Sequence, residues 1–155
     1  MKPMFKMLLS SAAVATIAVA GLADSASAGR RVPAFAGIAQ QPSQAGCLSN
    51  SLGVITNNCS GFVGFCIGLP YDYNVFGNWA DMTVTVFQPG SATLSCQAVT
   101  TFKDGGFAGW STNINADRTG TFTDIALHGG GIPDQGGVYT CCSLPPGGRM
   151  AVVNY

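Results

Sequence analysis

A cluster of aromatic and polar side chains between residues 71 and 81 is the part of the sequence richest in binding chemistry. The candidate ligand-binding residues are Tyr71, Asp72, Tyr73, Asn74 and Trp79. Aromatic rings stack on the C–H face of a sugar ring, while neighbouring amides and carboxylates bond its hydroxyl groups. The cluster therefore predicts contact with a neutral glycan. Two alternatives stay open: Phe76 and Trp79 fold back as a lid over the core, or the loop joins Phe107 and Trp110 in an interface for a cell-surface protein.

Hydrolytic chemistry has few side chains to draw on. The sequence holds a single histidine, His128, and no serine stands in a G-x-S-x-G motif. Triad hydrolysis needs a nucleophile, a base and an orienting group together, whereas His128 precedes three glycines, which is typical of a surface loop. The aspartates lie mostly beside Gly or Asn in predicted turns. We therefore expect no enzyme and no catalytic residues, with a hydrolase kept as the second alternative.

The cysteines indicate covalent cross-links rather than a metal site. All six lie beyond residue 46, at Cys47, Cys59, Cys66, Cys96, Cys141 and Cys142. No C-x-x-C pair occurs, so zinc is disfavoured and neither a metal nor a cofactor is expected. An even count in an exported chain predicts three disulfides. Because Cys141 and Cys142 are adjacent on a predicted strand, they point to opposite faces and need different partners.

The first 28 residues are predicted to be a cleavable signal peptide. Two lysines precede an apolar run from Met7 to Leu22, and Ala26-Ser27-Ala28 forms an A-x-A-like cleavage site. The run is shorter than the roughly 20 residues that span a bilayer. The mature chain is thus expected to have no transmembrane segment and to be secreted, periplasmic or attached to the cell surface.

The composition limits both the partners and the number of domains. Charged residues make up only 9% of the chain and the net charge is zero, so nucleic acid is not expected as a partner. Hydrophobic residues make up 47%, which excludes wholesale disorder. The expected organisation is a signal peptide over 1–28, a flexible N-terminal arm over 29–46 and one folded domain over 47–155.

Short alternating segments separated by Gly and Pro predict an all-β chain. Expected strands lie at 53–57, 62–69, 82–87, 93–102, 110–115, 121–127, 138–144 and 149–155. The segment 82–102 predicts a β-hairpin and the C-terminus a second one. Imperfect alternation over 121–127 predicts a bulge. Six to eight short strands without intervening helices favour an antiparallel β-sandwich.

Three motifs resemble a loose group of short exported bacterial proteins of unknown function. They are Cys66 with Pro70, then Leu94-Ser95-Cys96, then the C-x-L-P-P-G run from Cys142 to Gly147 that leads into the final hairpin. The resemblance implies an exported β-sandwich of bacterial origin and transfers no catalytic residue. Because Cys59 and Cys141 look like additions to that group, it also implies that they pair with each other. Three arrangements then remain, among which Cys96–Cys142 bridging the sandwich and Cys47–Cys66 are favoured.

The sequence therefore leads to one favoured functional hypothesis. With few titratable groups on a cross-linked scaffold, we expect a secreted, non-catalytic interaction or structural protein. A carbohydrate-binding module is the first alternative.

Overall fold

Twelve β-strands and two short 3-10 helices form over residues 30–70, 79–131, 133 and 135–155, which the computed structural model describes. The strands are β1 (Arg31–Pro33), β2 (Ile38–Ala39), β3 (Leu48–Ser51), β4 (Val54–Asn57), β5 (Val63–Leu69), β6 (Trp79–Phe87), β7 (Ser95–Thr101), β8 (Phe107–Trp110), β9 (Ile114–Asn115), β10 (Phe122–Gly131), β11 (Gly137–Leu144) and β12 (Arg149–Asn154). The helices are η1 (Ala34–Ala36) and η2 (Pro42–Cys47). The predicted signal peptide lies outside the described residues.

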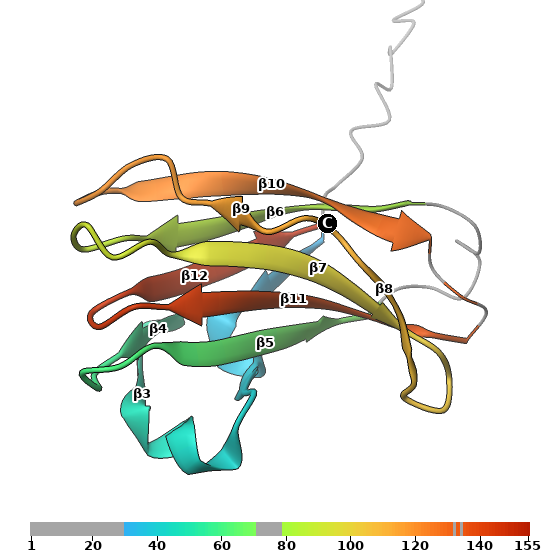
Figure 1. The fold of residues 1–155 in the computed structure, drawn as a ribbon, viewed down its shortest axis with the longest axis horizontal. Helices are drawn as coiled ribbons and strands as arrows, with labels where there is room; N and C mark the ends of the chain where they lie inside the picture. The colour runs from blue at the N-terminus through green and yellow to red at the C-terminus, as the bar shows by residue number, and fades with distance from the viewer. Residues whose placement is uncertain (1–29, 71–78, 132, 134) are drawn as a thin grey trace, which may run out of the picture.

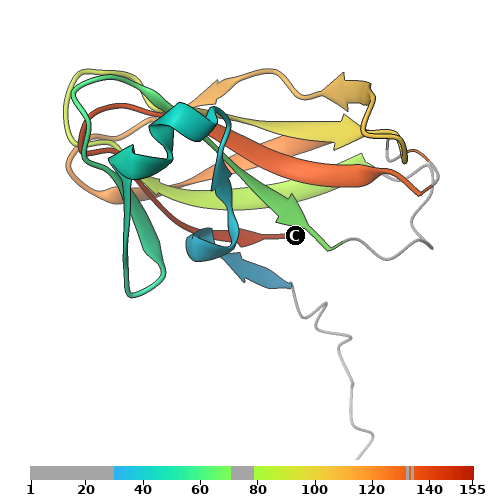
Figure 2. The same cartoon turned by 90° about the horizontal axis from the view of Figure 1, so that it is seen from below.

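The strands form two antiparallel sheets that pack face to face, so the predicted β-sandwich is confirmed, with more strands than expected. Sheet A has the order β10-β6-β12-β4-β3, and β1 also pairs with β12. Sheet B has the order β2-β5-β11-β7-β8, and β9 also pairs with β7. In Figure 1 sheet B lies toward the viewer, in front of β12 and β4, and Figure 2 shows the two layers from the side.

The core is built from the alternating apolar residues that the sequence pattern predicts. In β6, Met82, Val84 and Val86 are buried while the threonines between them are partly exposed. In β5 of the other layer, Phe65 and Ile67 are buried in the same core cluster. One face of each strand is thus removed from water, which is the main stabilising contribution of such a fold.

The hairpin predicted over 82–102 is wrong. β6 joins sheet A and β7 joins sheet B, so the two strands pack across the core instead of pairing. Gln88 holds the connection: its side-chain oxygen accepts a hydrogen bond from the Leu94 N–H at 2.8 Å, and its amide donates to the Gly90 carbonyl at 3.1 Å. An alternating pattern requires only that one face of each strand be buried, and an arch between the layers achieves this as well as a hairpin does.

The predicted C-terminal hairpin is wrong for the same reason. β11 is the middle strand of sheet B, between β5 and β7, whereas β12 lies inside sheet A. The turn between them crosses from one layer to the other. Gly147 in this turn has φ of +73°, which a residue with a side chain rarely adopts.

The bulge in β10 lies further along the strand than predicted. Pairing with β6 is unbroken from Phe122 opposite Phe87 to His128 opposite Asp81, and the register shifts only between His128 and Gly131. Phe122 is apolar but points outward, so the apolar residues of this segment do not alternate strictly. Its ring centroid lies 5.4 Å from that of Phe87.

Residues 29–46 do not form a flexible arm where the structure describes them, from residue 30 onward. β1 pairs with β12 of sheet A and β2 pairs with β5 of sheet B, and Ala34 between them is fully buried. Figure 2 shows this segment, blue to cyan, crossing from one layer to the other. Strands of two or three residues are too short to show a period, so the sequence pattern does not reveal them.

Gly37 marks the point where the N-terminal segment crosses β5. A Cβ at this position would stand 2.5 Å from both the Cys66 carbonyl oxygen and the Phe65 ring. We expect Gly37→Ala to lower the free energy of unfolding by about 1 to 3 kcal/mol, because β2 must move away from β5. Gly46→Ala is the matched control, since a Cβ there meets nothing within 4 Å. Equal stability of the two variants in chemical denaturation would contradict this packing.

All six cysteines are paired, and two of the three favoured pairings are wrong. The bonds are Cys47–Cys59, Cys66–Cys141 and Cys96–Cys142. Cys96–Cys142 is as predicted but joins neighbouring strands of sheet B rather than bridging the sandwich. The predicted Cys59–Cys141 and Cys47–Cys66 bonds are replaced because Cys66 lies directly opposite Cys141 on the adjacent strand.

Adjacent residues of β11 therefore bond to strands on both sides. Cys141 points outward and is bonded to β5, while Cys142 points into the core and is bonded to β7. Disulfides of this number are typical of exported proteins in oxidising compartments. Among the described residues, no helix has the length and apolarity needed to cross a membrane.

Candidate functional site

The loop singled out by sequence lies almost entirely outside the described residues. This holds for Tyr71, Asp72, Tyr73 and Asn74. Trp79 is the first residue of β6, opposite Gly131 of β10. A glycan-binding role for these five residues stays a prediction, and the structure directs attention to a different surface.

The outer face of sheet B carries a pair of exposed aromatic rings on β8. Trp110 is 64% exposed and Phe107 is 51% exposed, and their ring centroids lie 4.5 Å apart with the ring planes 37° from parallel. They stand opposite Val99 and Thr101 of β7, with a register irregularity between the two pairs. The rings support each other while remaining open to solvent.

Tyr139 of β11 extends this aromatic surface across the sheet. Gly68, Tyr139, Val99 and Trp110 lie opposite one another in one line over β5, β11, β7 and β8. The Tyr139 ring lies close above two glycines: a Cβ on Gly68 would be 3.4 Å from the ring, and a Cβ on Gly137 would be 2.9 Å from it. The absence of side chains at these two positions lets the ring lie along the sheet, with the residue 38% exposed.

A hollow of about 340 Å³ lies beside Tyr139 at the far end of this line. The Cys66–Cys141 disulfide, Gly68 and Val99 line it on the sheet, and residues 36–40 line it from the N-terminal segment. The Gln40 amide is 3.1 Å from the Cys66 sulfur. The disulfide thus holds the strands beneath the hollow together.

Charge is absent from the strands of sheet B. None of the six strands contains Asp, Glu, Lys, Arg or His, so the polar side chains of these strands, such as Gln97 and Thr101, are all neutral. Sheet A differs, since its strands include Arg31, Asp81 and Arg149. We name the surface formed by Gly68, Val99, Phe107, Trp110 and Tyr139 with the adjoining hollow the aromatic face.

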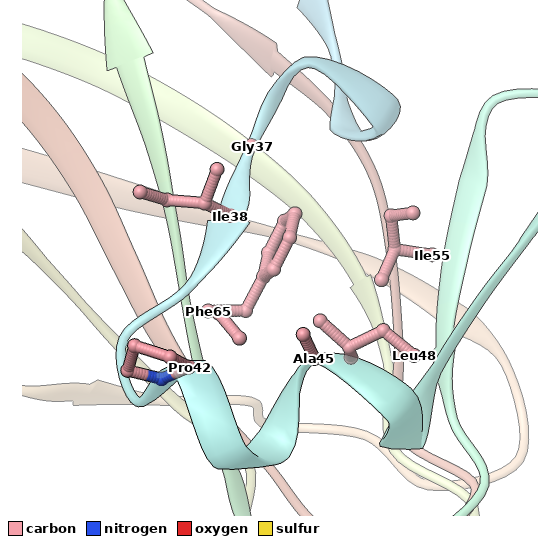
Figure 3. Close-up of a pocket in the computed structure, with 8 residues that line it drawn as sticks. Gly37, Ile38, Pro42, Ala45, Leu48, Ile55 and Phe65 are labelled. Atoms are coloured by element: carbon pink, nitrogen blue, oxygen red, sulfur yellow. The ribbon is translucent and has the colours of Figure 1, made fainter.

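A second cavity, of about 440 Å³, lies between the N-terminal segment and the two sheets. Figure 3 shows Phe65, Ile55, Leu48 and Ala45 facing a common space beneath Ile38. Its lining residues have no polar side chain. Ligand sites usually combine an apolar lining with a few placed polar groups, so this cavity is a weaker candidate than the aromatic face.

The outer face of sheet A holds a histidine and an aspartate in contact. His128 lies on β10 rather than in a loop, and its Nδ1 is 2.9 Å from the Asp81 carboxylate on β6. Asp81 and Asp124 both belong to strands, Asp124 within the strand predicted over 121–127, and the Thr85 hydroxyl donates to Asp124 at 2.6 Å. The alternation of β10 could have placed His128 on a strand face, had the glycines after it not indicated a loop.

The His128–Asp81 pair is open to solvent. The His128 and Asp81 side chains are 77% and 67% exposed, so water screens their interaction. Within the described part of the chain, no hydroxyl or thiol is hydrogen-bonded to the His128 ring, and no cluster of three metal-ligating side chains occurs. The pair lines a hollow of about 310 Å³ with Asn154, whose Oδ1 is buried without a hydrogen-bond partner among the described residues.

Comparisons with known proteins find distant structural likeness only. No family model and no curated protein sequence matches the chain. The enzymatically active domain of bacteriophage CBA120 tailspike protein 4 is similar, with 14% identity, a TM-score of 0.44, and coverage of 63% of this chain and 14% of that one. TmCBM61, solved in complex with β-1,4-galactotriose, has 9% identity, a TM-score of 0.39, and coverage of 83% and 87%.

A third structure, of carbohydrate-binding modules of promiscuous specificity from the β-sandwich superfamily, has 12% identity and a TM-score of 0.40, with coverage of 81% of this chain and 51% of that one. The chain thus spans a small part of the tailspike domain and about half of this third chain. Similarity this low carries no argument about binding, which has to come from the geometry of the chain itself.

Proposed function

We propose that this chain is an exported, non-catalytic binding protein that contacts its partner through the aromatic face of sheet B. The observation that carries the proposal is the line of exposed rings, Trp110 with Phe107 and then Tyr139, on a sheet without charged side chains. Exposed apolar surface gathered on one face is typical of an interaction site. Aromatic side chains dominate such sites because each buries a large area at a low cost in conformational entropy.

The scaffold supports a role in binding rather than in catalysis. Two disulfides hold β5, β11 and β7 together beneath the aromatic face, so little ordering free energy is required when a partner binds. The Asp81–His128 pair lies on the opposite sheet and is exposed. Export, and the bacterial origin implied by the sequence resemblance, are part of the same proposal, because the disulfides and the predicted signal peptide agree.

The proposal predicts that binding to envelope material depends on Trp110. We expect the exported protein to sediment with bacterial envelope fragments, and Trp110→Ala to weaken that binding at least about tenfold, because one ring contact is lost. The measurement is the bound fraction as a function of fragment concentration.

Phe122→Ala is the matched control, since Phe122 is a 44% exposed aromatic residue on the outer face of the other sheet. It should bind like the unchanged protein. A Trp110→Ala variant that is folded and binds as well as Phe122→Ala would overturn the proposal.

A further inference from the structure

The neutrality of the aromatic face narrows the class of partner. Protein interfaces that depend on aromatic residues are usually enriched in arginine as well, whereas the six strands of sheet B have no charged residue. Along these strands an anionic polymer would find no cation and a cationic one no carboxylate; Lys103 and Asp104, which have opposite charges, lie in the turn between β7 and β8. The side chains present are aromatic rings, amides and hydroxyls, which match the C–H faces and hydroxyl groups of an uncharged sugar.

The register of the strands gives the direction of the ligand. Tyr139 and Trp110 lie in one line with Val99 between them, so they are two strand spacings apart. Two spacings amount to about 10 Å, which is comparable with the length of a disaccharide. A chain that covers both rings must therefore run across the strands and not along them.

The hollow beside Tyr139 adjoins the same line. Gly68, Tyr139 and Val99 of the line border it, the Cys66–Cys141 disulfide lines it two residues further along β5 and β11, and the N-terminal segment forms its wall. Gln40 borders it and Gln97 stands opposite Cys141 on the neighbouring strand. The Gln40 amide, which also donates to the Cys66 sulfur, and the Gln97 amide supply neutral hydrogen-bonding groups near a sugar unit next to the one on Tyr139.

Resting on the proposed function, we infer that the ligand is a linear, neutral oligosaccharide of at least four units. It lies across sheet B, with one unit on Trp110 and Phe107, the next over Val99, one on Tyr139 and the terminal unit in the hollow. The opposite sheet, with its charged strands, takes no part. None of its residues belongs to the set that the sequence indicated, Tyr71, Asp72, Tyr73, Asn74 and Trp79.

The test is calorimetric titration of the exported protein with neutral β-1,4-linked gluco-, manno- and xylo-oligosaccharides, from the monosaccharide to the hexasaccharide. Affinity for a bound series should rise at least about tenfold from the disaccharide to the tetrasaccharide and change little beyond it. Polygalacturonate, an acidic polymer, should bind more weakly than the neutral series. Trp110→Ala and Tyr139→Ala should each weaken binding at least about tenfold, and Phe122→Ala should not.

The outcomes separate this inference from the proposed function. If no neutral oligosaccharide binds, and protease treatment of the envelope fragments removes binding that depends on Trp110, the partner is a protein and the inference fails while the proposed function stands. If monosaccharides bind as tightly as tetrasaccharides, the extended site is wrong. If the binding that is observed is unaffected at both Trp110 and Tyr139, the inference and the proposed function fail together.

Discussion

Replacing both Cys96 and Cys142 by alanine is expected to lower the free energy of unfolding by about 5 kcal/mol. The bond joins residues 46 apart in sequence, and closing a loop of that length stabilises a fold by about 4 kcal/mol in the chain-entropy account. Both sulfur atoms lie in the core, since Cys96 is 0% and Cys142 2% exposed. Their removal also leaves a cavity, which adds to the loss.

The other two bonds supply a graded comparison. Cys66–Cys141 closes a longer loop but lies on the outer face, so its removal should cost about 4 kcal/mol with no core cavity. Cys47–Cys59 spans 12 residues and should cost about 3 kcal/mol. Thermal unfolding should show the core pair as the largest shift, about 15 °C or more. A core-pair variant as stable as the Cys47–Cys59 variant would contradict the account.

Single variants test which cysteines are joined. Cys141→Ala should leave Cys66 as a thiol that iodoacetamide alkylates in the folded protein, because Cys66 is partly exposed. Cys142→Ala should leave Cys96 protected until the protein unfolds, because Cys96 is buried. Alkylation of Cys59 in the Cys141→Ala variant would instead support the pairing implied by the resemblance.

The positions of the main strands could be predicted from the sequence because each has one buried face. The segment from Met82 to Phe87 and the one from Val63 to Leu69 alternate apolar and other residues, and both are strands with the expected side inward. This information is local to each strand. It settles which residues enter the core and therefore the fold class.

Strand pairing could not be predicted in the same way. The segments before and after Pro89 could form either a hairpin in one sheet or an arch between two sheets. Both arrangements bury the same face of each segment, so the alternating pattern does not distinguish them. The choice depends on which other strands compete for each edge. β7 takes β11 and β8 as neighbours, and β6 takes β10 and β12.

The disulfide pairing, too, could be predicted only in part from the sequence. Adjacency alone establishes that Cys141 and Cys142 bond to different partners on opposite faces of β11, and this is confirmed. Which partners they take follows from the register of β5 and β7 against β11. That register is not visible in the sequence of any one strand.

The sequence indicates Phe107 and Trp110 as interface residues, but it does not reveal that Tyr139 extends this surface, because these residues are distant in sequence. Trp110 and Tyr139 belong to strands that do not pair with each other, and only β7 between them brings the rings into one line. Two signals were available: the absence of charge from the segments 62–69, 93–102 and 138–144, and Gly137 two residues before Tyr139. Neither identifies a site until the neighbouring strands are known.

A buried asparagine stabilises the turn between β11 and β12, where the chain crosses from sheet B to sheet A. Asn57, the last residue of β4, is 0% exposed. Its side-chain amide donates to the carbonyls of Gly61 at 2.8 Å and Leu144 at 2.9 Å, and its Oδ1 accepts from the Cys59 N–H at 2.9 Å. Its own carbonyl accepts from Gly147 in the turn between β11 and β12.

We expect Asn57→Ala to lower the free energy of unfolding by about 3 kcal/mol, because the Leu144 carbonyl and its neighbours lose their partner in a site that water does not reach. Asn57→Asp has nearly the same shape but places a carboxylate, which cannot donate, against two carbonyl oxygens, so its loss should be at least as large. Asn58→Ala, at the exposed neighbouring position, should change stability by less than about 0.5 kcal/mol. Urea denaturation of the three variants measures these differences. If Asn57→Asp were as stable as Asn58→Ala, shape and not hydrogen bonding would hold the crossing, and the role assigned to Asn57 would be wrong.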